Sequence, residues 1–166
     1  MCGYQPDAGR LHYYYSISTL IDMIQHTYHS KSKPREQSIT ENVDERHVAI
    51  VLYFCTLREA LLNNFLLSMM HAYDLPQKII ERLWDDNKLY SQKQNKLFPS
   101  LTKEKWNSAI QKISDKQHDY IALDAFIKNI SRMRNSFLHE GNKWSIEELA
   151  ARECFEHVPL LMHMHA

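Results

Sequence analysis

The most constraining feature of this chain is a long apolar segment near its middle, VAIVLYFCTLREALLNNFLLSMM, at residues 48–70. The segment has no glycine or proline, and its apolar side chains occupy every face of a helix rather than one stripe. The predicted helix ends at about Tyr73 and has roughly 30 residues, or about 45 Å at 1.5 Å per residue. Because Arg58 and Glu59 interrupt the apolar run, we interpret it as the buried central helix of a globular domain rather than a membrane span.

The rest of the chain also favours helices. Three glycines and five prolines among 166 residues are too few for a turn-rich β fold. Between Leu11 and Tyr28, apolar residues recur at spacings of three and four, which predicts an amphipathic helix. A lysine-rich connection is predicted through Pro99, with Thr102 as the N-cap of the helix that follows it, and Pro159 is predicted to kink or end the last helix. Further helices are predicted over residues 76–86, 102–114, 118–139 and from 145 onward.

We therefore predict a single all-α domain, a bundle of five or six helices that spans residues 1–166. Residues 1–37 would form an N-terminal helix and loop. Residues 38–166 would form the core, and they begin with Ser38 and Glu41 at capping-box spacing. A chain of this length can bury a sizeable hydrophobic core.

Charge and cysteine content exclude several classes of protein. Lysine plus arginine equals aspartate plus glutamate, 20 against 20, so a broad polyanion-binding surface is not expected. The charge is uneven, however, because residues 88–116 hold seven lysines and two acids. The three cysteines have no CxxC or framework spacing, and the first residues lack the pattern of a signal peptide. We expect reduced thiols, a cytoplasmic location and no membrane association.

Three histidines near the end of the chain are the only cluster that suggests a metal. Two of them, His163 and His165, stand two places apart and would point to different faces of a helix, and no cysteine or acid has ligand spacing with His157. The sequence also lacks a phosphate-binding GxxxxGK[ST] loop and a GxSxG motif. We expect neither a metal site nor a cofactor.

The segment RMRNSFLHEG, residues 132–141, places two arginines on different faces of one predicted helix. The residues three and four places from Arg132 are all polar, so Arg132 is predicted to lie on the solvated face. Arg134 is predicted to lie in the core-facing stripe, where an unpaired charge is costly. The apolar helical neighbours of Arg134 are Ile127, Ile130, Phe137 and Leu138.

Glu59 is the candidate partner of Arg134, because it is a carboxylate among apolar neighbours in the long central helix. An Arg134–Glu59 ion pair would satisfy both charges, and its loss would markedly lower the melting temperature. Arg58 also has apolar helical neighbours and is an alternative donor. A pair of this kind is often purely structural, which is the simplest alternative to a functional role.

His139 stands in the last turn of the same predicted helix, before Gly141, a residue type that commonly ends helices. It lies four residues after Asn135, so the two side chains can touch. Exposed carbonyls at a helix C-terminus stabilise a cation, and a histidine in such a place suits acid–base chemistry near neutral pH.

The run RNSFLH, from Arg134 to His139, resembles the R-x4–6-H motif of HEPN domains (higher eukaryotes and prokaryotes nucleotide-binding), with Asn135 directly after the arginine. The resemblance covers about residues 40–160. It implies an all-α bundle with the motif late in the chain, at the end of one core helix. Glu59 is similar to the acidic residue that often faces the motif from an earlier helix in this family.

The resemblance implies a metal-independent endoribonuclease, acting as a toxin, abortive-infection factor or defence effector, with a composite active site across a homodimer. Arg134 would bind the scissile phosphate, and His139 would move protons as the 2′-hydroxyl attacks. Asn135 would orient His139 or contact the phosphate, and Glu59 would hold Arg134. Gly141 stands where partner-regulated members carry a modified tyrosine, so that form of control is excluded, and a protein antitoxin or inhibitor is the partner to consider.

Lysines and aromatic residues interleave between residues 88 and 106. Cations and aromatic rings together suit single-stranded RNA, so four of the lysines are candidate RNA-binding residues. The alternative is a solvated segment whose aromatic residues belong to the core. The four candidates are Lys93, Lys96, Lys103 and Lys105.

Two other functions are open at this point. The first is a non-catalytic HEPN module that binds a nucleotide, RNA or a protein partner. The second is a scaffold bundle in which the buried arginine is structural. Toxicity on expression, relieved by loss of Arg134 or His139, would discriminate the nuclease from both.

Overall fold

The computed structural model describes residues 8–30, 45–141 and 146–165, with side chains described from Ser16 onward, and these residues form helices and no strand. The all-α prediction is therefore confirmed. In chain order the elements are α1 (Ala8–His29), α2 (Glu45–Ala72), α3 (Gln77–Asp86), α4 (Tyr90–Gln92), the π-helical segment η1 (Lys93–Leu97), α5 (Phe98–Thr102), α6 (Trp106–Ile113), α7 (Tyr120–Glu140) and α8 (Glu148–Met164).

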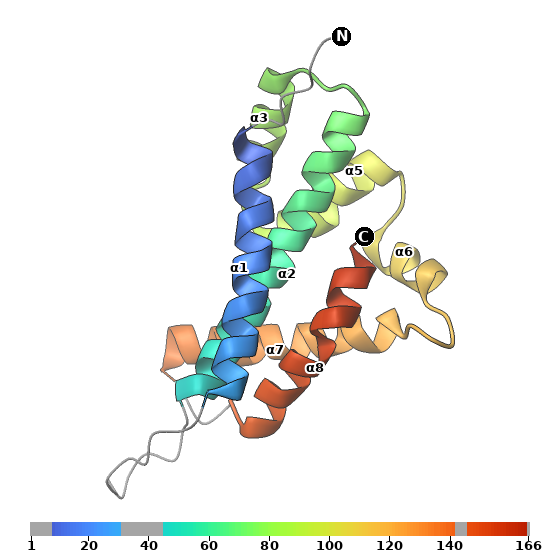
Figure 1. Cartoon of the computed structure of the whole chain (residues 1–166). Helices are drawn as coiled ribbons and strands as arrows, with labels where there is room; N and C mark the ends of the chain where they lie inside the picture. Colours follow the sequence, from blue (N-terminus) through green and yellow to red (C-terminus); the bar gives the residue numbers. More distant parts are fainter. Residues whose placement is uncertain (1–7, 31–44, 142–145, 166) are drawn as a thin grey trace, which may run out of the picture.

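Helix α2 is the centre of the bundle, as its all-round apolar sequence predicts. Helices α1, α7 and α8 pack against it, with α1 running alongside α2 and α7 crossing α2 at a steep angle (Figure 1). Eleven of the 28 residues of α2 are buried, which accounts for its composition, because a helix surrounded by other helices has no solvated face. Its fully buried side chains are Ile50, Val51, Phe54, Leu57, Leu62, Leu66 and Met70.

Among the described residues, α2 is also the one helix that is long and apolar enough to cross a membrane by length and composition alone. Core helices of globular proteins meet the same criterion. More than half of the most apolar stretch of α2, 56%, is buried against the other helices, so packing within the bundle is sufficient to explain its hydropathy.

The described part of the chain has seven α-helices of five residues or more, where five or six were predicted. The difference lies after α3, where a connection was predicted through Pro99 and the chain instead forms α4, η1 and α5. Leu97, Phe98 and Leu101 in this segment are buried. Their burial against the core holds the segment in helical turns.

The predicted start of a helix at Thr102 is wrong, and of the two predictions for Pro159, a kink or an end of the last helix, the end is wrong. Thr102 ends α5 rather than starting the next helix, and its Oγ1 accepts a hydrogen bond from the Glu104 amide at 3.3 Å, while α6 begins at Trp106. Pro159 lies inside α8, which continues to Met164. Buried residues on both sides of this proline hold α8 against the bundle, and this packing outweighs the missing backbone hydrogen bond. The predicted capping-box pair Ser38–Glu41 lies outside the described residues.

Helix α1 belongs to the same hydrophobic core as the helices after residue 38. Ile17 and Ile24 are buried, and the ring of Tyr28 stacks on Phe155 of α8 with centroids 4.0 Å apart. From Ile17 onward, where side chains are described, the apolar seam predicted for this helix therefore packs on α2 and α8. The predicted division at residue 38 does not separate α1 from the core.

The histidines of α8 pack against aromatic rings, in keeping with the structural role predicted for them. The His157 ring stacks on Phe126 at 4.6 Å between centroids, and the His163 ring stacks on His118 at 4.5 Å. His165, directly after the helix, is enclosed so that its Nε2 atom has no hydrogen-bond partner.

We expect this enclosed His165 to make the fold sensitive to acid. Burial lowers the pKa of His165 to about 4, whereas an unfolded histidine titrates near 6.5. The unfolded chain therefore binds a proton that the folded chain excludes, so stability is full above about pH 6.5 and is lost as the pH falls towards 4, by about 3 kcal/mol in all. Urea unfolding at pH 7.5 and 4.5 should show a smaller loss for His165→Phe than for the unsubstituted chain.

The control for this experiment is His26→Gln, since His26 is exposed on α1. Its pH dependence should match that of the unsubstituted chain. An unchanged pH dependence in His165→Phe would show that another group is responsible for the acid sensitivity.

Candidate active site

Arg134 on α7 and Glu59 on α2 form the predicted ion pair, with Arg134 Nη2 3.4 Å from Glu59 Oε1. Arg134 Nη1 also donates to Oδ1 of the adjacent Asn135 at 3.1 Å. The expected burial of this pair is wrong, because the Arg134 and Glu59 side chains are 30% and 37% exposed. The fully buried residues of α7 stop at Ile130, and Arg134 lies one turn beyond, where the side chains that pack against the core are only partly buried.

The buried arginine among the described side chains is Arg58, which the sequence offered only as an alternative partner for Glu59. Arg58 is 7% exposed, and its Nη1 donates to Ser131 Oγ at 2.6 Å. Its guanidinium carbon lies 3.8 Å from the ring centroid of Tyr90. The Nε atom of Arg58 is buried and has no hydrogen-bond partner.

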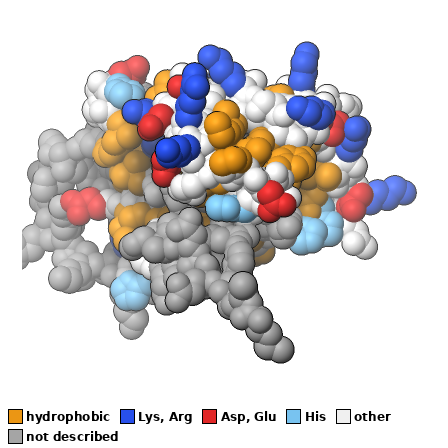
Figure 2. Space-filling view, turned by 90° about the horizontal axis from the view of Figure 1, so that it is seen from above, with side chains coloured by type: hydrophobic (Ala, Val, Ile, Leu, Met, Phe, Trp, Pro, Cys, Tyr) orange, Lys and Arg blue, Asp and Glu red, His pale blue; other side chains and the backbone are white. Residues whose placement is uncertain are grey.

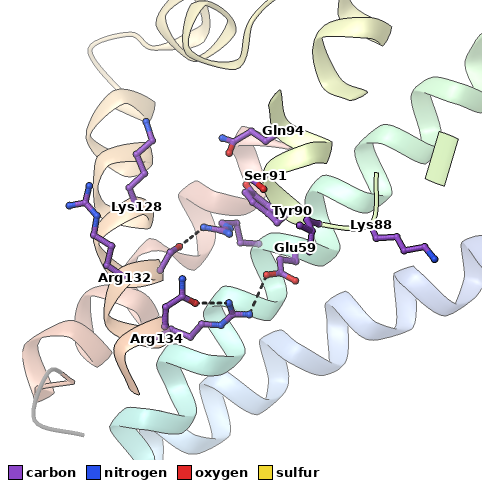
Figure 3. Close-up of a pocket in the computed structure, with 12 residues that line it drawn as sticks. Glu59, Lys88, Tyr90, Ser91, Gln94, Lys128, Arg132 and Arg134 are labelled. Atoms are coloured by element: carbon purple, nitrogen blue, oxygen red, sulfur yellow. Dashed lines mark hydrogen bonds and ion pairs between the residues drawn. The ribbon is translucent and has the colours of Figure 1, made fainter. Parts of the chain in front are cut away.

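These side chains line a pocket of about 630 Å³ between α2, α7 and the segment from the end of α3 to η1 (Figure 3). Arg134 points across the pocket towards Glu59, while Lys128 and Arg132 stand on α7 at its outer rim. Five cationic residues line the pocket and only one acid does, so the pocket favours anions. The lining residues are Arg58, Glu59, Lys88, Leu89, Tyr90, Ser91, Gln94, Lys128, Ser131, Arg132, Arg134 and Asn135.

The predicted solvated face of α7 forms a wall of this pocket. Arg132 is exposed, as predicted, but its side chain lines the pocket rim, and no ion pair is found for it among the described residues. Lys128 also lines the rim, and its Nζ lies 2.6 Å from Asp124 Oδ2. At spacings of four, three and four residues, one side of α7 carries Lys128, Arg132, Asn135 and His139.

His139 is exposed in the last turn of α7 and does not line the pocket that holds Arg134. Gly141 ends the helix, as predicted, with φ of 66° and its amide bonded to the Phe137 carbonyl at 3.1 Å. The Asn135 carboxamide turns towards Arg134. Within one chain, therefore, the structure brings Arg134, Asn135 and Glu59 together and leaves His139 beside them at the helix end.

The four lysines predicted to bind RNA do not line this pocket. Lys93 is buried, its Nζ donates to Asn63 Oδ1 at 2.9 Å and lies 4.0 Å from the Trp84 ring centroid, and burial lowers its pKa. Lys96, Lys103 and Lys105 are exposed. An ammonium that is already held inside the fold is not available to a surface ligand, so Lys93 leaves the set of candidates.

The aromatic residues of the same segment mostly belong to the core. Phe98 and Trp106 are buried with ring centroids 5.1 Å apart. This agrees with the alternative interpretation, in which the aromatic residues of the segment belong to the core. Tyr90 is different, because it supports Arg58 in the pocket.

In the view from above, acidic side chains and hydrophobic side chains lie among the lysines and arginines, so this face is not uniformly basic (Figure 2).

The sequence reasoning missed Arg58, Lys88, Lys128 and Tyr90 as pocket residues. A signal was present for one of them, because Lys128 stands four residues before Arg132 on the polar face of α7. The others come from α2 and from the connection after α3, and only the packing of these elements against α7 brings them to the pocket.

No three histidine, cysteine, aspartate or glutamate side chains come together as a metal site within the described ranges. Cys55 and Cys154 are free and buried, and burial raises the pKa of both thiols. No protein-family model, curated protein or solved structure matches this chain.

We expect Glu59→Gln to change the free energy of unfolding by less than about 1 kcal/mol, because both members of the Arg134–Glu59 pair are partly solvated. The marked destabilisation expected for a buried pair does not apply here. Urea unfolding measures the effect, with Glu81→Gln on the exposed face of α3 as the matched control. A loss above about 2 kcal/mol would mean that Glu59 has a structural role beyond this pair.

Proposed function

We propose that this chain is a metal-independent endoribonuclease of the HEPN type. The observation that carries the proposal is the placement of Arg134, held by Glu59 and Asn135 in the wall of a cationic pocket, with His139 exposed five residues further along the same helix. Both ends of the RNSFLH motif are thus accessible to a ligand. The resemblance of this motif to the HEPN R-x4–6-H motif supports the same function.

RNA cleavage at such a site needs charge stabilisation and proton transfer, because the substrate carries its own nucleophile. The 2′-oxygen attacks the adjacent phosphorus as it loses its proton, and the bond from phosphorus to the 5′-oxygen breaks as that oxygen gains a proton. The products are a 2′,3′-cyclic phosphate and a 5′-hydroxyl. Arg134 stabilises the charge on the phosphoryl oxygens, His139 moves the protons, and Asn135 steadies Arg134.

The position of His139 at the helix end, outside the pocket lining, favours a site completed by a second copy of the chain. The two proton transfers call for a base and an acid, and one chain offers a single histidine at this helix end. A homodimer that brings two α7 ends together would supply both groups and place each His139 near a phosphate held at Arg134. Light scattering that gives a monomer mass at micromolar concentration would contradict this arrangement.

The biological role that fits such an enzyme is a cytoplasmic toxin, abortive-infection factor or defence effector. An unregulated ribonuclease harms its own cell, so a protein antitoxin or inhibitor would accompany it. Expression should slow the growth of the host, and Arg134→Ala should relieve the effect.

A non-catalytic HEPN module is the second candidate. One observation favours it. The Asn135 side chain accepts a hydrogen bond from Arg134 and so holds Arg134 rather than His139. Such a module would bind RNA, a nucleotide or a protein partner through the pocket and release it unchanged.

Cleavage of a mixed RNA pool in the presence of a chelator tests the proposal. We expect the unsubstituted chain to leave 2′,3′-cyclic phosphate and 5′-hydroxyl ends, identified by their resistance or susceptibility to end-specific enzymes. Binding of RNA without cleavage, for a preparation shown to be dimeric, would favour the non-catalytic module.

A further inference from the structure

Arg58 is a buried cation without a buried anion. Only 7% of Arg58 is exposed. Within the described part of the chain, its side chain contacts the Ser131 hydroxyl and the Tyr90 ring but no carboxylate. Its Nε has no hydrogen-bond partner. A buried charge without a counter-ion is costly, so an anion that enters the pocket would stabilise this guanidinium.

The acidic groups around Arg58 are engaged elsewhere. Glu59, the adjacent residue, is paired with Arg134. Asp124 accepts hydrogen bonds from Trp106 Nε1 at 2.9 Å and pairs with Lys128 at 2.6 Å. Tyr90 cannot supply the missing charge either, because burial raises its pKa to about 12 and the phenol stays neutral.

The position of Arg58 relative to Arg134 suits two neighbouring anions. Ser131, which holds Arg58, precedes Arg134 by three residues, so the two guanidinium groups reach the same pocket about one turn apart along α7. Arg132 lies at the pocket rim without an ion pair among the described residues. A volume of about 630 Å³ is also larger than one phosphate needs and is typical of a site for a small organic ligand.

We propose that Arg58 binds a second phosphate of a single-stranded RNA, the one next to the phosphate held by Arg134. The inference rests on the proposed function, because it places the strand along α7 at the RNSFLH motif. Arg58 presents a planar fork that Ser131 orients from one edge and Tyr90 supports from one face, which suits a phosphate. Arg132 adds charge at the rim. The strand thus contacts α2 and α7, and not the lysines of the α5–α6 region.

Short RNA analogues that cannot be cut provide the test. The probes are 2′-O-methyl trinucleotides without terminal phosphates, one with two phosphate linkages and two others with one linkage replaced by a neutral methylphosphonate. Binding to the unsubstituted chain is followed by NMR titration. We expect the doubly charged probe to bind roughly tenfold or more tightly than either singly charged probe, the usual effect of a charge-assisted hydrogen bond. Equal binding of all three probes overturns the proposal.

Arg58→Met keeps the apolar bulk of the side chain and should reduce the preference for two charges to less than about twofold. Lys78→Met, at an exposed lysine of α3 outside the pocket, is the matched control and should keep the full preference. If Arg58→Met does not fold, Arg58→Lys retains the charge without the planar fork and should show a reduced preference. A folded Arg58 variant that discriminates like the unsubstituted chain contradicts the assignment.

The result separates this inference from the proposed function. A chain that prefers two charges through Arg58 but leaves natural RNA intact refutes the nuclease and keeps the phosphate site. A chain that cleaves RNA with the expected ends but does not distinguish the three probes keeps the nuclease and refutes the role of Arg58.

Discussion

His139→Ala is expected to reduce the rate of RNA cleavage by about two to four orders of magnitude while leaving the fold unchanged. Proton transfer by a positioned side chain contributes about 10²–10⁴-fold to the rate, and in the proposed mechanism His139 carries both transfers. Because His139 is exposed at the end of α7 and no described residue is bonded to it, its loss removes no packing. The measurement is the initial rate of cleavage of a labelled RNA, with a chelator present.

The control is His26→Ala, which removes an exposed histidine from α1 and should keep full activity. Thermal unfolding of both variants should match that of the unsubstituted chain. Equal cleavage by the His139→Ala protein would indicate a contaminating nuclease and would remove the main support for the enzyme. Loss of cleavage together with a lowered melting temperature would point to a structural effect instead.

Phe54→Ala is expected to lower the free energy of unfolding by about 3–5 kcal/mol, as for other large-to-small changes in a packed core. Phe54 is 1% exposed in the middle of α2, and its ring meets Phe126 of α7 edge to face at 5.9 Å between centroids. Truncation leaves a cavity where α2 and α7 cross, and a rigid helix crossing cannot collapse to fill it. Thermal unfolding should shift down by roughly 6–20 °C for a chain of this size.

Phe54→Leu is the matched control, because it keeps most of the apolar volume and should lose considerably less stability than Phe54→Ala. Both proteins are measured in buffer without detergent, which makes the result informative about α2 as a whole. A core helix predicts cooperative unfolding under these conditions. A negligible effect of Phe54→Ala would mean that α2 is not packed as the central helix of the bundle.

The helices and the centre of the bundle follow from local pattern. An apolar run as long as residues 48–70 is too long for one buried strand and is typical of a helix surrounded by other helices, and this holds for α2. The same reasoning paired Arg134 with Glu59, because each is a charge on an otherwise apolar helix face. The lysine-rich segment was harder, since Leu97, Phe98 and their neighbours are too few to show a period, and only their burial in the core holds them in helical turns.

Burial of the charged residues did not follow from local pattern. The helical neighbours of Arg134 are apolar, yet Arg134 lies past the last buried residue of α7 and stays partly solvated. Arg58 and Lys93 are inside, although one was only an alternative partner and the other was assigned to the surface. Periodicity predicts the face of its own helix on which a side chain lies, but burial depends on whether another element covers that turn.

By itself, then, the sequence determined the helical class and the central position of α2, because these depend on the period and composition of single helices. It proposed the pairing of Arg134 with Glu59 but left Arg58 as an alternative donor, and the packing of α7 on α2 decided between them. The tertiary structure decided which arginine is buried, which cations line the pocket, and that His139 lies outside it. These features depend on how α2, α7 and the α3–α4 connection meet. Contacts between distant segments are set by the packing of whole helices, and no local pattern encodes where one helix stops covering another.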